Sequence, residues 1–275
     1  MSEVIKKLTD LTYLDWTKSR HSSGTAGSFL KAYEKHGNKK TYYKLSNYEA
    51  DKGIVGHECV NEIIACRLLD LLGVKHLSYT LVHAKVMVRD IVYETYLCRS
   101  EDFKKPGDSK VALDAYYDME HLQNESPIGF CLRQGWDSFI YDMLTIDYLI
   151  LNRDRHGANI EILRNRYEKS VRPAPLFDQG LSLTFSTEEN ELESVDFLAD
   201  KKIQCFVGGS SSFENLKLIP AEKMKKLPDF NEELKAVLFK DLDGVISRKR
   251  IETDWKFLRQ RAEAYENLRN KRQYD

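Results

Sequence analysis

The chain has 275 residues, a length that suits one large domain or two lobes sharing a cleft and that excludes a mini-protein. Its 42 lysine and arginine residues nearly balance its 43 aspartate and glutamate residues, so the net charge of −1 gives the whole chain no electrostatic attraction for nucleic acid or anionic lipid. The first residues lack the apolar stretch of a signal peptide, and no apolar run approaches the roughly 20 residues of a membrane helix. We therefore expect a cytoplasmic protein with neither a direct nucleic-acid partner nor a membrane partner.

Residues 19–50 predict a glycine-rich turn followed by a β-hairpin. The turn is SerSerGlyThrAlaGly at 22–27. Two short aromatic strands around Phe29 and Tyr42 are joined by Gly37 and Asn38, which are typical hairpin-turn residues. Taken alone, the turn is more typical of an ordinary loop than of a phosphate-binding loop, because the sequence contains neither GxGxxG nor GxxxxGK[ST].

A helix and two strands follow in the same predicted lobe. Apolar residues recur at helical spacing from about Gly56, and Gly73 supplies a stop. Residues 79–88 then alternate in the period-2 pattern of a half-buried strand, and a second strand follows at 91–98. Because a polar stretch comes next, we predict a first lobe at 1–104 and a helical second lobe at 105–275.

The second lobe contains the densest polar segment of the chain. A helical stripe from Trp136 runs directly into LeuAsnArgAspArgHisGlyAlaAsn at 151–159. Short apolar strands at 160–162 and 174–177 predict a hairpin, which places Asn159 and Asp178 at its two joined ends. An amide and a carboxylate are hard oxygen ligands for Mg²⁺, and Asp154 lies close enough in sequence to project into the same pocket.

This set of side chains is the minimum for phosphoryl transfer. The reaction needs a carboxylate that orients a hydroxyl and ligands that neutralise phosphate charge. DxxxxN followed by DxG matches the catalytic loop and metal motif of the protein-kinase plan, except that His156 follows Asp154 instead of preceding it. Arg155 has two interpretations: it contacts phosphate, or it pairs with a nearby carboxylate such as Asp147, and we favour the structural role.

The segments at 154–159 and at 176–183, LeuPheAspGlnGlyLeuSerLeu, resemble the HipA-like serine/threonine kinases. The phosphatidylinositol kinases share the DRHxxN string, so that string alone does not choose between protein and lipid substrates. ThrTyrTyrLysLeuSer at 41–46 resembles the family's ATP-lysine strand, and AsnGluIleIleAlaCysArgLeuLeu at 61–69 resembles its first-lobe helix. The resemblance extends from residue 22 to 183, and the remainder matches only as a generic helical tail.

The resemblance implies an α+β, two-lobed protein-kinase-like fold of the HipA/phosphatidylinositol-kinase type, with ATP between a small antiparallel-sheet lobe and a larger helical lobe. Lys44 is favoured as the ATP lysine over Lys31 and Lys39 because only Lys44 lies among apolar and aromatic neighbours. The resemblance implies that Asp154 is the catalytic residue and that Asn159 and Asp178 are Mg²⁺ ligands. It implies that Lys44 is the phosphate anchor, with Glu62 as its ion-pair partner, and that His156 is part of the ATP site. The implied phosphate loop is Ser23, Gly24, Thr25, Ala26 and Gly27, and the implied adenine contacts are Leu97, Cys98 and Arg99.

The implied function is ATP- and Mg²⁺-dependent transfer of the γ-phosphate to a serine or threonine of a protein. Inhibitory autophosphorylation is expected in the glycine-rich loop, at Ser22, Ser23 or Thr25. A lipid kinase and a catalytically inactive nucleotide-binding module are the alternatives. The implied partners are a protein substrate and an antitoxin-like or regulatory protein. Family members that pair with a DNA-binding antitoxin carry a further domain before this loop, and the 21 residues ahead of Ser22 argue against that association.

Overall fold

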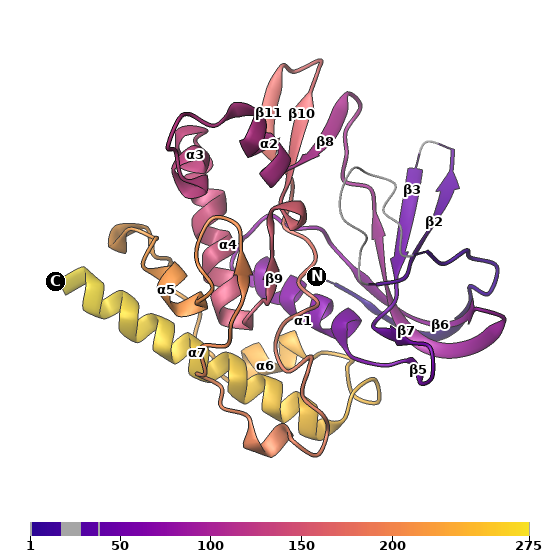
Figure 1. Ribbon diagram of the computed structural model, residues 1–275. Helices are drawn as coiled ribbons and strands as arrows, with labels where there is room; N and C mark the ends of the chain where they lie inside the picture. Colours follow the sequence, from indigo (N-terminus) through magenta and orange to yellow (C-terminus); the bar gives the residue numbers. More distant parts are fainter. Residues whose placement is uncertain (1, 18–28, 38, 275) are drawn as a thin grey trace.

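The computed structural model describes residues 2–17, 29–37 and 39–274 and has a mixed α+β fold (Figure 1). A twisted sheet lies on one side of the molecule, and most of the helices lie on the other, with the long C-terminal helix crossing beneath them. This agrees with the predicted fold class. All five cysteines are free thiols.

The first sheet has five strands in the order β1-β6-β7-β3-β2. β1 pairs parallel with β6, whereas the other neighbours are antiparallel. The predicted strands at 79–88 and 91–98 are confirmed, although the second runs on to Glu101, and the first hairpin strand begins after Phe29 instead of being centred on it. The strands are β1 (Val4–Asp10), β2 (Lys31–His36), β3 (Lys39–Lys44), β6 (Thr80–Val88) and β7 (Ile91–Glu101), with a small separate hairpin of β4 (Tyr48–Glu49) and β5 (Gly53–Ile54).

Helix α1 (Glu58–Leu71) connects this sheet to the rest of the chain. It is the predicted helix, and every residue from Glu58 to Leu69 is buried because the sheet and other helices cover it on several sides. The Arg67 side chain donates to the carbonyl oxygens of Leu238 and Lys240, at 2.8 Å each. The first-lobe helix is therefore also part of the core of the helical region.

A second sheet has three strands in the order β11-β10-β8. The predicted hairpin forms, but its second strand is β11 (Ser170–Pro173), so the expected strand at 174–177 is wrong. That apolar run is used elsewhere, because the Leu176 backbone pairs with the segment at Lys75–Leu77. The third strand, β8 (Asp108–Ala112), lies within the stretch interpreted as a polar boundary and pairs with β10 (Glu161–Asn165).

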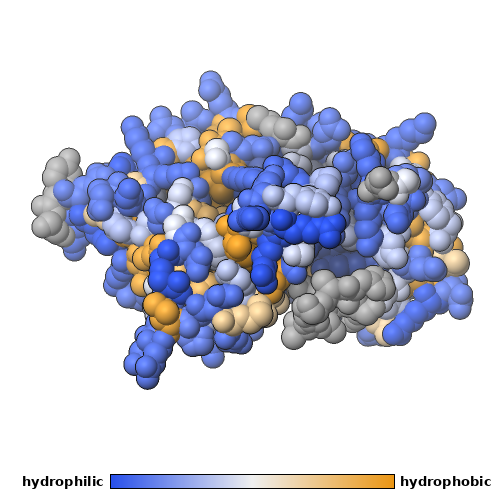
Figure 2. All heavy atoms as spheres, turned by 90° about the horizontal axis from the view of Figure 1, so that it is seen from above, coloured by the Kyte–Doolittle hydropathy of each residue, from blue (hydrophilic) through white to orange (hydrophobic). Residues whose placement is uncertain are grey.

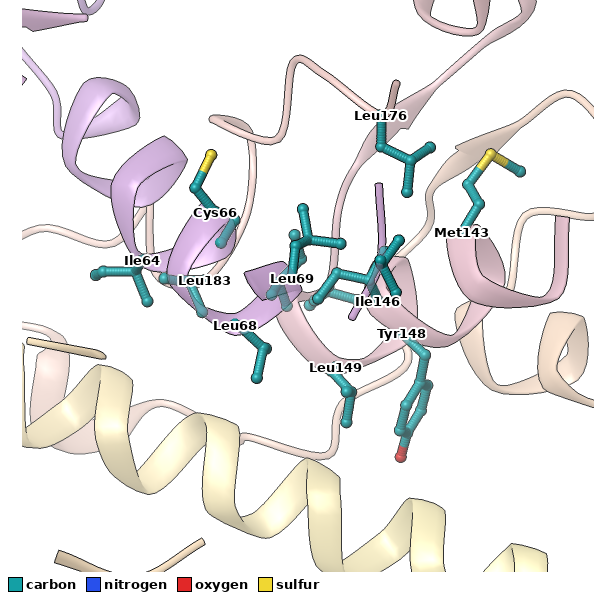
Figure 3. Close-up of a cluster of buried hydrophobic side chains, with 14 of the residues drawn as sticks. Ile64, Cys66, Leu68, Leu69, Met143, Ile146, Tyr148, Leu149, Leu176 and Leu183 are labelled. Atoms are coloured by element: carbon teal, nitrogen blue, oxygen red, sulfur yellow. The ribbon is translucent and has the colours of Figure 1, made fainter. Parts of the chain in front are cut away.

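The helices pack around one large apolar core. Figure 3 shows Leu68 and Leu69 of α1 facing Ile146 and Leu149 of α4 above the last helix. The predicted C-terminal stripe is confirmed as a core stripe, because Trp255, Leu258 and Tyr265 are buried. The remaining elements are α2 (Leu113–Glu120), α3 (Pro127–Arg133), α4 (Asp137–Ile150), α5 (Ser212–Leu216), α6 (Glu232–Leu238), α7 (Arg248–Tyr274), the strand pair β9 (Asp154–Arg155) and β12 (Gln204–Cys205), and the 3₁₀ turns η1 (Gly157–Asn159), η2 (Leu192–Ser194) and η3 (Ala221–Lys223).

Candidate active site

A buried ammonium group lies between two carboxylates where the sheet lobe meets the helical lobe. Lys44, the last residue of β3, places its Nζ 3.0 Å from Oε1 of Glu62 on α1 and also in ion-pair contact with Asp178. The Glu62 side chain has no exposed surface, and its other oxygen accepts a hydrogen bond from the Gln179 backbone at 2.8 Å. The strand, the helix and the Asp178 segment therefore meet at one ion network.

The two carboxylates keep Lys44 charged. Burial by itself would lower the pKa of Lys44, but the charges of Asp178 and Glu62 outweigh burial and raise that pKa well above its ordinary value. Burial raises the pKa of Glu62, and the Lys44 charge opposes that shift. A fixed positive charge at the inner end of a cleft is suited to binding phosphate.

Asp178 lies in an uncommon backbone conformation. Its φ of +61° is in the left-handed region, which aspartate tolerates better than most residues with a Cβ atom. Two residues later the chain passes against α1 so closely that a Cβ on Gly180 would lie 3.0 Å from the Glu58 carbonyl oxygen. Position 180 therefore favours glycine, because a Cβ there would crowd the backbone of α1.

The residues Asp154, His156 and Asn159 lie together just after α4. The Asn159 carboxamide nitrogen donates to the Asp154 backbone oxygen at 2.8 Å and to its carboxylate at 3.3 Å. Nε2 of His156 lies 3.6 Å from the same carboxylate. The Asp154 side chain remains about a quarter exposed, so its carboxylate is accessible from solvent.

Arg155 connects this group to Asp178. Its guanidinium forms an ion pair with Asp147 of α4 at 2.8 Å, which confirms the structural interpretation. The same guanidinium donates to the backbone oxygen of Phe177, the residue immediately before Asp178, at 2.9 Å. The DRHxxN segment and the Asp178 segment are thus held side by side in the way the predicted hairpin required.

A pocket of about 300 Å³ extends outward from Lys44 between the two lobes. Tyr33 and Tyr42 of the sheet line it, and so do Phe103 and Phe177, whose ring centroids lie 6.4 Å apart. An aromatic-lined pocket with a cation and a carboxylate at its inner end can accept a planar base with an attached phosphate chain.

The predicted adenine contacts lie in and near this pocket. Cys98 lines it, whereas Leu97 lies in the apolar cluster on the other face of the sheet, because successive strand residues point to opposite faces. Arg99 does not line the pocket, for the same reason. The lining continues instead along Ser100, Glu101, Asp102, Phe103 and Lys104, which the sequence analysis did not select.

Lys31 is the site residue that sequence reasoning set aside. It lines the pocket, and its Nζ lies 4.0 Å from the Asp178 carboxylate. The signal was available in the hairpin register, because Lys31 pairs directly with Lys44 and opposed residues share a face. Lys39 lies at the far end of β3. The glycine-rich loop residues Ser22, Ser23, Gly24, Thr25, Ala26 and Gly27 lie outside the described residues.

The donors present are those that Mg²⁺ uses. Among the described residues, no group of three or more His, Cys, Asp or Glu side chains converges on one point, which excludes from this part of the chain an all-protein cage of those residue types. Mg²⁺ characteristically takes one or two protein oxygen ligands together with substrate phosphates. The Asp178 carboxylate and the Asn159 carboxamide fit that pattern.

Comparisons with known proteins agree with this geometry. No family model matches the sequence. Over 138 residues the chain is 28% identical to the serine/threonine-protein kinase CtkA of Helicobacter pylori, a match that covers 46% of this chain and 40% of that protein. The sequence match thus spans less than half of the length of this curated relative.

Two solved structures share the fold. The crystal structure of the Helicobacter pylori proinflammatory kinase CtkA has a TM-score of 0.64 at 16% identity and covers 95% of this chain and 98% of that one. The Shewanella oneidensis HipA, solved with HipB and operator DNA, has a TM-score of 0.50 at 15% identity and covers 94% of this chain and 68% of that one. The predicted HipA-like kinase fold is therefore confirmed.

Proposed function

We propose that this chain, a HipA-like kinase by fold and by its sequence relationship to CtkA, transfers the γ-phosphate of ATP to a serine or threonine hydroxyl of a protein in a Mg²⁺-dependent reaction. The observation that carries the proposal is the Lys44–Glu62–Asp178 ion network at the inner end of an aromatic-lined pocket. Asp154 and Asn159 lie beside it, joined to the Asp178 segment through Arg155. Positioning and charge neutralisation are the main requirements of phosphoryl transfer, and these residues meet both.

Each residue has a distinct role in the proposed reaction. Lys44 neutralises negative charge on the phosphates, and Glu62 holds its ammonium group at the inner end of the pocket. Asp178 and Asn159 would hold Mg²⁺, which when bound supplies positive charge against the β- and γ-phosphate oxygens. Asp154 accepts the hydrogen bond of the incoming hydroxyl, whose oxygen bonds to the γ-phosphorus as the bond to the ADP oxygen breaks, and Asp154 takes up the released proton.

The purine would lie in the aromatic part of the pocket. Phe103, Phe177 and Tyr42 line it and can stack on a planar base. Lys40 lies 4.9 Å from the Tyr42 ring centroid and 3.8 Å from that of Tyr33, so this end of the pocket also carries positive charge. The backbone from Ser100 to Lys104 borders the same space and can donate and accept hydrogen bonds to a base edge.

A protein acceptor is favoured over a lipid acceptor. The sequence relative is a serine/threonine-protein kinase. The face seen in Figure 2 is mainly hydrophilic, with apolar residues interspersed among polar ones. A regulatory protein partner, and inhibitory autophosphorylation of Ser22, Ser23 or Thr25, form part of the same proposal.

The test is phosphoryl transfer by the purified chain with Mg²⁺ and γ-labelled ATP, beside Asp154→Ala. One arm offers protein and peptide acceptors, a second offers phosphatidylinositol vesicles, and mass spectrometry locates any phosphate on the chain itself. The proposal predicts label on serine or threonine in the first arm and its loss in Asp154→Ala. Label in lipid would support the lipid-kinase alternative instead. Nucleotide binding without transfer to any acceptor would favour an inactive binding module.

A further inference from the structure

The Arg155 side chain is fully buried and is committed to three different chain segments. Its Nε and Nη2 donate to the two carboxylate oxygens of Asp147 on α4, at 2.8 and 2.9 Å. Its remaining terminal nitrogen, Nη1, donates to the backbone oxygens of Asn159 at 3.2 Å and Phe177 at 2.9 Å. Four hydrogen bonds thus fix a planar group between a core helix and two loops.

The two loop carbonyl groups have a particular position in the sequence. One belongs to Asn159 itself, and the other belongs to the residue immediately before Asp178. Asn159 and Asp178 are the two side chains assigned to Mg²⁺ in the proposed function. A single nitrogen atom of Arg155 therefore sets the separation between the backbone segments that carry both ligands.

Asp147 is also connected, through Asn152, to the backbone of Asp154. The Asn152 amide donates to Oδ1 of Asp147 at 2.9 Å, and the Asn152 side-chain oxygen accepts the backbone N–H of Asp154 at 3.3 Å. Asn152 has no exposed surface and Asp147 is 4% exposed. Hydrogen bonds at Asp147, near the end of α4, thus connect to the backbone segments that carry Asp154, Asn159 and Asp178 and hold them in place relative to one another.

We infer that Arg155, anchored by Asp147, is the positioning residue that makes Asn159 and Asp178 a single Mg²⁺ site. The inference rests on the proposed function and deepens it. Arg155 is fully buried and does not line the pocket, so it would act through the backbone that carries the two ligands. Its loss weakens the contribution of Mg²⁺ to nucleotide binding, whereas binding of ATP without metal, which depends on Lys44 and the aromatic pocket, stays near the wild-type value.

The dissociation constant of ATP is measured by calorimetry with Mg²⁺ and with EDTA. The readout is the dissociation constant in EDTA divided by that in Mg²⁺, which states how much Mg²⁺ strengthens ATP binding. In Arg155→Lys, which keeps the charge but cannot make the four-bond fork, that ratio falls by about 10- to 100-fold relative to wild type. Mn²⁺ affinity in the ATP complex, followed by electron paramagnetic resonance, falls in parallel. Excess Mg²⁺ partly restores phosphoryl transfer.

The matched control is Arg261→Lys. Arg261 is equally buried and also ties backbone carbonyls together, those of Tyr148 and Phe197 at 2.7 and 3.2 Å, but neither flanks an assigned ligand. This variant should keep the wild-type ratio even where its thermal stability falls. If Arg155→Lys fails to fold, the double change Asp147→Asn with Arg155→Gln removes both charges together and avoids an uncompensated buried ion.

Three outcomes separate the alternatives. A wild-type ratio in both Arg155 variants overturns the inference. An equal fall of the ratio in Arg155→Lys and Arg261→Lys also overturns it, because the effect would then follow from loosened packing. If wild-type protein binds ATP equally well with and without Mg²⁺, the proposed metal-dependent function fails instead, and the two failures are thereby distinguished.

Discussion

The molecule buries two cations near its candidate site, and they serve opposite purposes. Lys44 pairs with Asp178, a carboxylate that lines the pocket and that is proposed to bind Mg²⁺. Arg155 pairs with Asp147, which lies inside the helical core away from the pocket. Burial alone therefore does not distinguish a cation that can bind a ligand from a cation that only stabilises the fold. The position of its counter-ion does, because only a counter-ion that lines the pocket can be exchanged for a ligand.

The largest expected effect comes from removing the core counter-ion. Asp147→Ala leaves Arg155 fully buried without a carboxylate, so we expect the free energy of unfolding to fall by about 3–5 kcal/mol. Urea denaturation followed by circular dichroism measures this loss. A loss below about 1 kcal/mol would show that Arg155 does not depend on the ion pair, and the contrast with Lys44 would collapse.

Asp178→Asn should give the reverse pattern. The Asp178 side chain is partly exposed in the pocket, and Lys44 keeps Glu62 as partner, so the unfolding free energy should fall by less than the loss expected for Asp147→Ala. Phosphoryl transfer should fall by about 10²- to 10³-fold, because the charged ligand that would hold Mg²⁺ beside the phosphates is gone. Near-normal turnover with Mg²⁺ and ATP would contradict the metal assignment.

Asp254 is a third buried charged residue, and it does not line the pocket. Its titration is expected to make the stability of the fold depend on pH. Burial raises the pKa of Asp254 to about 6 from 3.8, despite a 2.6 Å hydrogen bond from Thr184 and the nearby charge of Arg250. Burial also lowers the pKa of His57 to about 4 from 6.5, so His57 is neutral in the folded protein near neutrality. The nearby charge of Arg250 lowers the pKa of both groups, and the charge of Glu189 raises it.

The two groups act with opposite sign. Between pH 4 and 6 the folded chain holds a proton on Asp254 that the unfolded chain has lost, so this contribution to stability falls as pH rises. His57 does the reverse, because the unfolded chain is protonated there, so its contribution rises with pH. Asp254→Asn should remove only the first contribution, and the variant should gain about 3 kcal/mol relative to wild type between pH 4 and 7. Parallel stability curves for the two proteins would show that Asp254 titrates normally.

The smallest expected effect sharpens the role of the pocket rim. Lys31 is 32% exposed on its side chain and 4.0 Å from Asp178, so Lys31→Met should weaken ATP binding only a few-fold, equivalent to about 1 kcal/mol. Lys39→Met, at the far end of the same hairpin, is the control and should leave the affinity unchanged. An effect of Lys31→Met as large as that of Lys44→Met would mean that Lys31 is the principal phosphate anchor.

Sequence reasoning succeeded where a local pattern determines the result. The spacing of apolar residues located α1 and α4, and the DRHxxN string with Asp178 led to residues that the fold connects through Arg155. It failed where a partner distant in sequence decides. The run at 174–177 looks like a hairpin strand, but Leu176 pairs instead with Lys75 and Leu77, roughly 100 residues earlier in the chain. Strand β8 was missed because its partner β10 lies about 50 residues away.

The site residues show the same division. Lys44 stood out by its apolar neighbours, whereas Lys31 was set aside although its register with Lys44 places both on one face. Leu97 and Arg99 were selected with Cys98 as a continuous segment, yet a strand presents only alternate residues to one side. Applying the alternation of strand side chains within β7 would have kept Cys98 and added Ser100.

The pairing of β9 with β12 has a consequence for synthesis of the protein. β9 pairs with β12 through backbone hydrogen bonds that Gln204 and Phe206 donate to the carbonyl oxygens of Arg153 and Arg155. The Arg261 side chain in the last helix donates to the carbonyl oxygen of Tyr148 near the end of α4. A nascent chain that has emerged only as far as Asp178 contains every assigned catalytic side chain but lacks the segments that fix the catalytic strand. Closing such distant contacts is slow compared with helix formation. Phosphoryl transfer should therefore appear only after residues beyond Arg261 have left the ribosome, which would keep an incomplete chain inactive during its own translation.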